Sequence, residues 1–214
     1  MLALLLLVAC SNPLDEGWEV AGRRDGVVVY QRPHPGSPHP EVLAVSIWDV
    51  PPWVAKNAVD DVEAKDGIPY LSEARVLKRD DNGVVIYNRV SPPVVSDRDY
   101  TIRFFDQSYT TDGVTIWIAR WKTANHEGPP KRSGVVRIPE NDGYWRFEPV
   151  DGGTRTRAHY WVYTNPGGAL PASFAAAGST TMMPDVVNAI ATRAKKPQYR
   201  KKMPPLPTRL APLP

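Results

Sequence analysis

The sequence predicts an α+β protein in which a curved antiparallel sheet packs against a long helix near the C-terminus. Between residues 70 and 163, short runs rich in β-branched and aromatic residues are separated by turn signals such as Asp80-Asp-Asn-Gly83. Helical patterns begin at Pro51-Pro52 and at Leu170. The 214-residue length suits one sizeable domain with terminal segments. Strands gathered together, with helices on either side in sequence, are typical of the α+β class.

The first residues resemble a bacterial lipoprotein signal. Residues 1–9 form a short, uncharged, Leu-rich run that is too short to span a membrane. The sequence Leu7-Val-Ala-Cys10 resembles a lipobox, in which the cysteine is lipidated. A hydrophobic start with a stray cysteine explains the apolar run but not the position of the only cysteine. We therefore expect a signal peptide over 1–9, a tether over 10–17 and lipidation of Cys10.

The tether is followed by a strand-rich segment and the first helix. Trp18 begins the fold, as a short helix. Residues 26–31 and 42–48 are predicted strands on either side of a Pro/Gly/His loop. Pro51-Pro52 opens a helix, because proline suits a first helical turn, and Gly67 ends it.

The central part of the chain reads as an antiparallel meander. Asn141-Asp-Gly143 and Asp151-Gly-Gly153 are predicted as turns before and after the strand over 144–150. The other predicted strands cover residues 71–78, 84–90, 98–108, 114–122, 133–139 and 154–163.

The last helix and the tail differ sharply in composition. An apolar stripe along the helix must be buried, and Pro184 is expected to kink the helix or to divide it in two. The chain has a net charge of +3, and the segment from Lys195 onward holds six Lys/Arg and no Asp/Glu, which leaves +3 − 6 = −3 for residues 1–194. The positive charge therefore belongs to the tail over 196–214, which argues against a nucleic-acid partner. This Pro-rich tail is expected either to be disordered in solvent or to contact anionic lipid or a partner protein. The apolar stripe of the last helix consists of Leu170, Phe174, Ala177, Met183, Val187, Ile190 and Ala194.

The sequence lacks the common catalytic and metal-binding motifs. There is no GxSxG elbow, phosphate-binding Gly loop or HExxH, and no two histidines have the spacing of metal ligands on a shared element. In Asp97-Arg98-Asp99, an ion-paired corner is favoured over an acid–base role. We expect no catalytic residue, metal or cofactor.

Alternation along three strands predicts an inner face that mixes aromatic, small and hydroxyl-bearing side chains. Such a face leaves room for an apolar ligand, although an ordinary aromatic core fits the composition as well. The predicted inner faces are Thr115, Trp117, Ala119, Trp121 and Thr123; Tyr100, Ile102 and Phe104; and Thr156, Ala158, Tyr160 and Val162.

Four segments, in their order and spacing, resemble a START domain, the helix-grip lipid-transfer fold. They are residues 94–100, 134–138, 143–149 and, most specifically, Thr164-Asn-Pro-Gly-Gly-Ala-Leu-Pro171. The resemblance covers about Trp18 to Ala194, so we take 18–195 as the START-like domain. It implies an internal hydrophobic cavity for a sterol, phospholipid or similar lipid, with the 91–96 loop and the last helix as its gate.

The resemblance and the alternation together give a set of expected site residues. Arg137 matches the strand arginine of the family, and Val94, Val95 and Leu170 belong to the expected gate. The expected ligand contacts are Tyr100, Ile102, Phe104, Thr115, Trp117, Ala119, Trp121, Arg137, Trp145, Phe147, Ala158, Tyr160, Val162, Phe174, Ala177 and Thr181.

These expectations combine into a non-enzymatic protein that binds or transfers a lipid and is anchored in a bacterial envelope. Ser11 after Cys10 is compatible with the outer membrane and its periplasmic side. The expected partners are a lipid or sterol, the membrane surface and envelope transport proteins. One alternative is an enzyme on the same scaffold, similar to polyketide cyclases or aromatic hydrolases. Another is a structural lipoprotein with a filled core.

Overall fold

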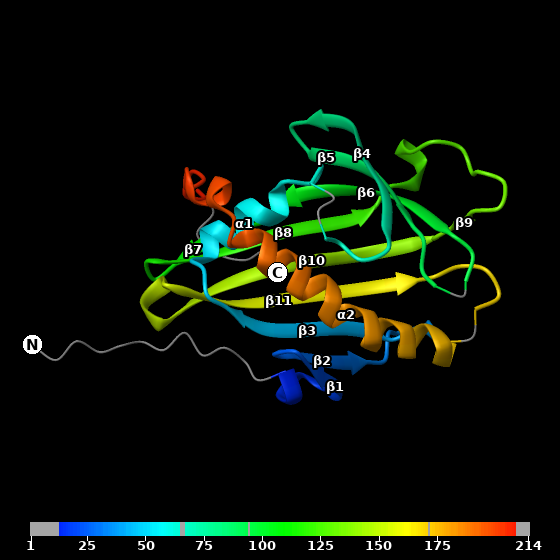
Figure 1. Cartoon of the computed structure of the whole chain (residues 1–214), viewed down its shortest axis with the longest axis horizontal. Helices are drawn as coiled ribbons and strands as arrows, with labels where there is room; N and C mark the ends of the chain where they lie inside the picture. The colour runs from blue at the N-terminus through cyan, green and yellow to red at the C-terminus, as the bar shows by residue number, and fades with distance from the viewer. Residues whose placement is uncertain (1–12, 65–66, 94, 171, 209–214) are drawn as a thin grey trace, which may run out of the picture.

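A computed structural model confirms the α+β class (Figure 1). It describes residues 13–64, 67–93, 95–170 and 172–208, with the side chains of 172–177 and 179 outside that description. The two α-helices are α1 (Pro52–Asp60) and α2 (Ala172–Ala194). The short 3-10 helices are η1 (Pro13–Glu16), η2 (Asn125–Glu127), η3 (Asp151–Gly153) and η4 (Pro197–Arg200).

The strands in the described part of the chain form one continuous sheet, predominantly antiparallel. In chain order they are β1 (Glu19–Arg24), β2 (Val27–Arg32), β3 (Glu41–Trp48), β4 (Leu71–Asp80), β5 (Gly83–Val90), β6 (Arg98–Asp106), β7 (Tyr109–Thr111), β8 (Val114–Thr123), β9 (Val136–Arg137), β10 (Glu140–Val150) and β11 (Arg155–Asn165).

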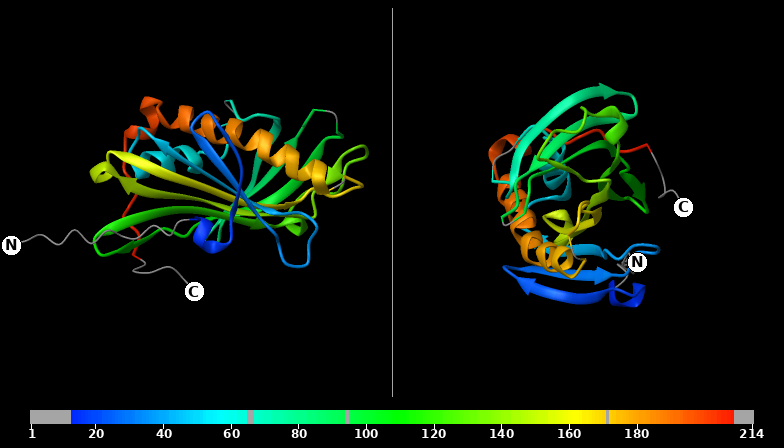
Figure 2. Two further views of the ribbon diagram at one scale, coloured as in Figure 1. Left: turned by 90° about the horizontal axis from the view of Figure 1, so that it is seen from below. Right: turned by 90° about the vertical axis from the view of Figure 1, so that its right-hand side faces the viewer.

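The strand order places the N-terminal strands beside the last strand of the chain. It runs β1-β2-β3-β11-β10-β8-β6-β5-β4, while β7 pairs with β8 and β9 runs parallel to β6. The sequence predicts the hairpins, but the pairing of β3 with β11 joins segments more than a hundred residues apart, as in Ala44 opposite Tyr160. Both α-helices lie on the inner face of this curved sheet (Figure 2).

The predicted inner faces are confirmed by burial. The described inner-face side chains of β8, β10 and β11 join one core with β3 and the two helices, including Trp48, Trp121, Trp145 and Phe147. The rings of Trp48 and Phe147 are 5.5 Å apart, and those of Trp145 and Phe147 5.9 Å. Aromatic pairs at such separations add to the hydrophobic gain of burial, so they stiffen this part of the sheet.

The expected turn at Asn141-Asp-Gly143 is wrong, because all three residues belong to β10. Gly143 meets the ring of Trp121, and a Cβ there would lie 2.2 Å from Trp121 Cζ2. Asp142 accepts hydrogen bonds from the backbone N–H and hydroxyl of Thr123. Gly143 therefore allows the close approach of Trp121, and Asp142 bridges to the neighbouring strand. Both residue types are also common in turns, which explains the wrong prediction.

Three other boundaries differ from the sequence prediction. Trp18 precedes a strand, β1, and the only helical turn beside it in the described chain is η1. α1 ends at Asp60 instead of near Gly67, since the backbone leaves the helix at Asp61, whose carboxylate accepts a hydrogen bond from Tyr199. The strand expected over 133–139 shrinks to β9, because only Val136 and Arg137 pair with β6.

α2 is continuous through Pro184, so a division into two helices is wrong. The buried apolar residues in the described part of α2, Met183, Val187, Ile190 and Ala194, belong to the predicted stripe. No helix of the described chain is long and apolar enough to cross a bilayer.

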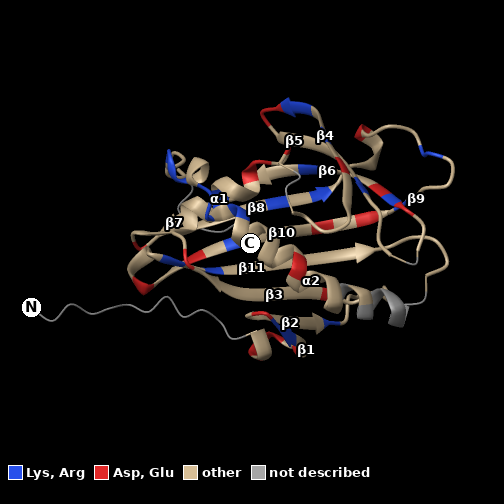
Figure 3. Cartoon of the chain, in the orientation of Figure 1, with Lys and Arg blue, Asp and Glu red and all other residues tan. Residues whose placement is uncertain are grey.

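The start of the basic tail is docked onto α1. Tyr199 of η4 is buried, and Asn57 Nδ2 donates to the backbone oxygens of Tyr199 and Lys202. The described tail then runs toward the outer side of the sheet, away from α2 (Figure 2). Figure 3 shows Lys and Arg interspersed with Asp and Glu along the strands instead of gathered on one element.

Candidate functional site

The inner face of the sheet and α2 enclose a cavity of two adjoining chambers. The inner chamber, about 280 Å³, lies deeper beneath α1 and α2, and the outer chamber, about 480 Å³, opens toward the loops before β6 and α2. Tyr70, Val90, Tyr160, Met182 and Val186 line both, so the two chambers adjoin. Each volume lies near or within the roughly 300–1,000 Å³ range typical of ligand sites.

The inner chamber is walled mainly by apolar side chains from four parts of the fold. The sheet contributes aromatic rings, α2 contributes Met182, Val186 and Ile190, α1 contributes Val59, and the segment after it contributes Val62 and Ile68. The sheet side consists of Leu71, Ile86, Asn88, Val90, Tyr100, Ile102, Phe104, Trp121, Asn141, Trp145 and Tyr160.

The outer chamber reaches the rim where a ligand would enter. Pro92, Pro93 and Val95 line it from the β5–β6 loop. Leu170 lines it from the segment before α2, and Gly178 and Thr181 line it from α2 itself. The predicted gate elements Val95 and Leu170 therefore face one space, while Val94 lies outside the described residues.

A few polar groups reach this apolar space. Arg98 lines the outer chamber, and its guanidinium donates to the backbone oxygens of Pro166 (3.2 Å) and Ser96 (2.7 Å). Arg98 therefore ties the two rim loops together. Asn141 lines both chambers and is held by Trp121 Nε1 (2.8 Å) and Thr164 Oγ1 (2.9 Å).

Two of the cavity tyrosines, Tyr100 and Tyr160, are kept in the neutral form. Burial raises the pKa of Tyr100 to about 12, although a hydrogen bond with Asn88 acts in the opposite direction. Burial likewise raises the pKa of Tyr160, with a smaller contribution from Tyr100. Tyr160 has no hydrogen-bond partner within the described chain, so its hydroxyl is available to a ligand.

The structure brings many of the predicted ligand contacts to the cavity and places others elsewhere. Trp117, Ala119, Phe147 and Ala158 face inward but lie in the packed core outside both chambers, where α1 covers β8 and β10. The hydroxyl of Thr115 lies 3.1 Å from that of Thr110 in the β7–β8 hairpin. The predicted ligand contacts that do line the cavity are Tyr100, Ile102, Phe104, Trp121, Trp145, Tyr160, Val162 and Thr181. Cys10 and the side chains of Phe174 and Ala177 lie outside the description.

Arg137, expected among the ligand contacts, lies outside the cavity. Its Nε and Nη2 donate to Asp99 Oδ1 (2.6 Å) and Oδ2 (3.1 Å), and Tyr87 Oη also donates to Asp99 (3.1 Å). Asp99 alternates with the cavity residues Arg98 and Tyr100, so this cluster is on the outer face of β6. Asp99 of β6 is thus the acidic partner of Arg137. Because a buried carboxylate needs a basic partner, the Arg137 side chain is directed to Asp99 and not into the cavity.

Arg98 and Asn141 are cavity residues that the expected set omits. Arg98 stands two residues before Tyr100, so strand alternation could have found it. Asn141 was missed because the sequence Asn141-Asp-Gly143 was predicted as a turn. The two carboxylates of the predicted corner are ion-paired, but with Arg89 and Arg137 instead of Arg98: Arg89 pairs with Asp97 and Arg137 with Asp99. No group of three or more His, Cys, Asp or Glu suited to a metal occurs in the described part of the chain.

A curved antiparallel sheet that grips a C-terminal helix over an apolar cavity defines a helix-grip protein. Comparison with solved structures identifies the fold more narrowly. A STAR-related lipid transfer protein of Xanthomonas axonopodis is 25% identical, with a TM-score of 0.74 over 84% of this chain and 99% of that chain. Human StAR-related lipid transfer protein 5 is 18% identical, with a TM-score of 0.72 over 86% of this chain and 88% of that chain. The chain therefore has the START fold, and the resemblance seen in the sequence is confirmed.

Other comparisons are less specific. An uncharacterized protein of Pseudomonas aeruginosa is 29% identical over 175 residues, which is 80% of this chain and 83% of that protein. An aromatase/cyclase of a Streptomyces species is 14% identical, with a TM-score of 0.51 over 72% of this chain and 93% of that chain. No family model matches the sequence.

Proposed function

We propose that the protein binds a lipid or sterol in the cavity between α2 and the sheet and carries it between membranes of a bacterial envelope. The observation that carries this proposal is the pair of adjoining, mainly apolar chambers beneath α2. A filled core would leave no such space, so the structural-lipoprotein alternative is disfavoured. The likeness to a bacterial protein whose name includes lipid transfer supports the same conclusion.

The raised pKa values of Tyr100 and Tyr160 and the contacts of Arg98 favour binding over catalysis. An acid–base catalyst works best with a pKa near the operating pH. Tyr100 and Tyr160 have raised pKa values, and Arg98 is occupied with two backbone oxygens of the rim. Such groups orient a ligand by hydrogen bonds without exchanging protons at neutral pH. We therefore propose that the protein is not an enzyme.

The cyclase-type alternative keeps one supporting observation. Tyrosine hydroxyls and an arginine face the same space, and a START-fold cyclase shares the architecture. Turnover of an aromatic polyketide that is lost in Tyr160→Phe would favour this enzyme over a carrier.

Purified protein is expected to retain a bound lipid. Native mass spectrometry should show a complex heavier than the apoprotein by one lipid, and organic extraction should release that lipid for identification. The tryptophan emission of delipidated protein should then change on titration with the extracted lipid, because Trp121 and Trp145 line the inner chamber. Only apoprotein, with no spectral response at saturating lipid, would contradict lipid binding.

Tryptophan variants show where the lipid sits. Trp121→Phe should lose much of the response, and Trp117→Phe should keep it, because Trp117 is buried on the same strand and face but lines neither chamber. Equal responses in both variants would place the ligand elsewhere.

We propose that Cys10 anchors the protein to the envelope, at the periplasmic side and in the outer membrane. The support is the lipobox-like Leu7-Val-Ala-Cys10. Cys10→Ala should abolish lipid labelling and move the protein from the membrane to the soluble or unprocessed fraction in a bacterial host. Unchanged membrane association of that variant would remove this part of the proposal.

A further inference from the structure

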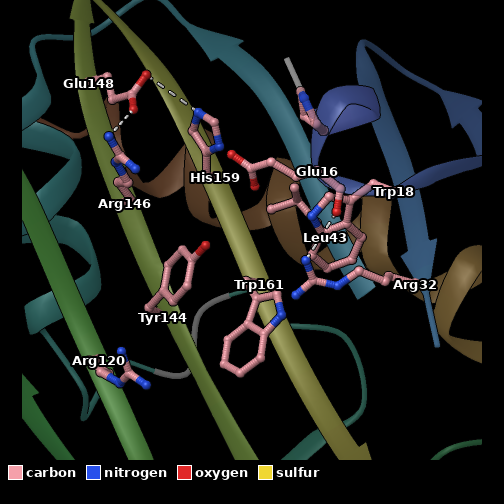
Figure 4. A pocket seen from close by; sticks show the side chains of 11 residues that line it. Glu16, Trp18, Arg32, Leu43, Arg120, Tyr144, Arg146, Glu148, His159 and Trp161 are labelled. Atoms are coloured by element: carbon pink, nitrogen blue, oxygen red, sulfur yellow. Dashed lines mark hydrogen bonds and ion pairs between the residues drawn. The ribbon is translucent and has the colours of Figure 1, made fainter. Parts of the chain in front are cut away.

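The outer face of the sheet carries another pocket, of about 310 Å³, that is separate from the cavity beneath α2 (Figure 4). Arg120 of β8, Tyr144 and Arg146 of β10, and Trp161 of β11 alternate with inward-facing neighbours such as Trp121. Pro13 and Glu16 of η1 form part of the rim. The thickness of the sheet thus separates this outer pocket from the cavity.

Strand register builds the floor of the outer pocket. Tyr144 pairs directly with Arg120 on one neighbouring strand and with Trp161 on the other, so the three side chains form a row across the sheet. The rings of Tyr144 and Trp161 stack with centroids 5.4 Å apart and planes at 21°. Trp161 Nε1 donates to Glu41 Oε2 (3.1 Å), which fixes the indole. The row therefore offers a fixed aromatic surface beside a guanidinium.

Three donors around this surface lack acceptors. Neither the guanidinium of Arg120 nor the hydroxyl of Tyr144 has a hydrogen-bond partner within the described chain. Arg146 Nε is buried without an acceptor, although its Nη2 lies 2.7 Å from Glu148 Oε1. Burial raises the pKa of the Tyr144 hydroxyl, so it remains a donor. Buried donors are normally satisfied, so Arg146 Nε indicates a missing acceptor, while the half-buried side chains of Arg120 and Tyr144 add two further donors around the same pocket.

Two of the nearby carboxylates have basic partners, and a third, Glu16, is exposed at the rim of the pocket. Glu41 meets Arg32 at 2.6 Å and His34 at 3.0 Å. Glu148 meets Arg146, and lies 3.5 Å from His159 Nε2 and 3.8 Å from Arg157. Arg120 has no ion-pair partner among the described residues, so its guanidinium can pair with an incoming anion.

We propose that the outer pocket binds a small organic anion with a flat ring and a carboxylate or phosphate group. The ring lies on the Tyr144–Trp161 surface, and the oxyanion accepts from Arg120, which lies on the side of Tyr144 away from Arg146 (Figure 4). The volume is at the lower end of the roughly 300–1,000 Å³ range of ligand pockets, which suits a small molecule.

The test uses benzoate and phenyl phosphate as probes. Calorimetry measures their binding, and the indole N–H signals in NMR spectra of ¹⁵N-labelled protein show which tryptophans the bound probe affects. Each indole signal is assigned from a single Trp→Phe variant. Trp161 and Trp18 are expected to shift with at least one probe, while Trp121 and Trp145 in the cavity stay fixed. Shifts confined to Trp121 and Trp145, or no binding of either probe at millimolar concentration, would overturn the proposal.

Arg120→Gln and Lys122→Gln form the matched pair of variants. Lys122 lies two residues further along β8 on the same face, is exposed and does not line the pocket. Loss of one charge-assisted contact in Arg120→Gln should weaken the probe by about tenfold or more. Lys122→Gln should leave its Kd unchanged, and equal weakening in both variants would indicate only general charge attraction and overturn the site.

Two further probes separate the parts of the ligand. Benzyl alcohol keeps the ring without the charge and should bind far more weakly than benzoate or phenyl phosphate. Inorganic phosphate keeps the charge without the ring and should also bind more weakly. Phosphate binding as tight as that of phenyl phosphate would refute the role of the aromatic floor. The preferred probe of the first pair tells whether the natural anion is a carboxylate or a phosphate.

Discussion

Linking Val95 to Leu170 through engineered cysteines is expected to stop lipid exchange. The two side chains line the outer chamber from opposite loops. A lipid enclosed beneath α2 cannot leave through a closed wall without breaking many packed contacts, so these loops must separate. α2 is suited to such movement, because Gly178 costs roughly 1 kcal/mol of helix stability relative to Ala and Pro184 removes one helical hydrogen bond.

The experiment measures transfer of a fluorescent lipid between vesicles in a Cys10→Ser background. A direct disulfide, or a short cleavable thiol linker if the Cα atoms lie farther apart than about 7 Å, should reduce transfer to the rate without protein. Reduction should restore it. Arg23→Cys/Val28→Cys is the control, because these residues pair across the β1–β2 hairpin away from the chambers. Transfer at the unmodified rate with the linked form complete would exclude this gate and point to an entrance beside residues 68–71 of the inner chamber.

Replacing Arg137 by Met is expected to lower the free energy of unfolding by about 3–5 kcal/mol, the usual cost of breaking a buried ion pair. The side chain of Asp99 is 1% exposed and that of Arg137 9%. Removing the arginine leaves the carboxylate buried with only the Tyr87 hydroxyl. It also removes the contact from Arg137 Nη2 to the backbone oxygen of Pro129, which holds the loop before β9. Urea denaturation followed by circular dichroism measures the loss.

A second ion pair serves as the control. Arg155 bonds to Asp49 at 2.9 Å, but both side chains are largely exposed, at 45% and 69%. Arg155→Met should therefore change stability by less than about 1 kcal/mol. The triple variant Tyr87→Phe/Asp99→Leu/Arg137→Met should regain much of the loss, because no charge or hydroxyl is then left unpaired. A loss in Arg137→Met no larger than that in Arg155→Met would contradict the role of this pair.

Much of the cavity wall was predictable because strand sidedness is a local property. Successive side chains point to opposite faces, so the run Tyr100, Ile102, Phe104 and the position of Trp121 needed only the sequence. The same rule could have added Arg98. It could not separate Trp117 from Trp121, which share a face, because the position of α1 decides which of them meets packed side chains and which meets space.

The sequence by itself determined the α+β class, most hairpins, the buried stripe of the last helix and the likeness to START domains, since these depend on short-range periodicity and turn chemistry. Only the tertiary structure decided that Gly143 lies in a strand against Trp121, that Arg137 pairs with Asp99 outside the cavity, and that Arg120, Tyr144 and Trp161 meet in one row. Each of these depends on which strands become neighbours and in what register. That choice is made by pairing between segments distant in the chain, and no local pattern encodes it.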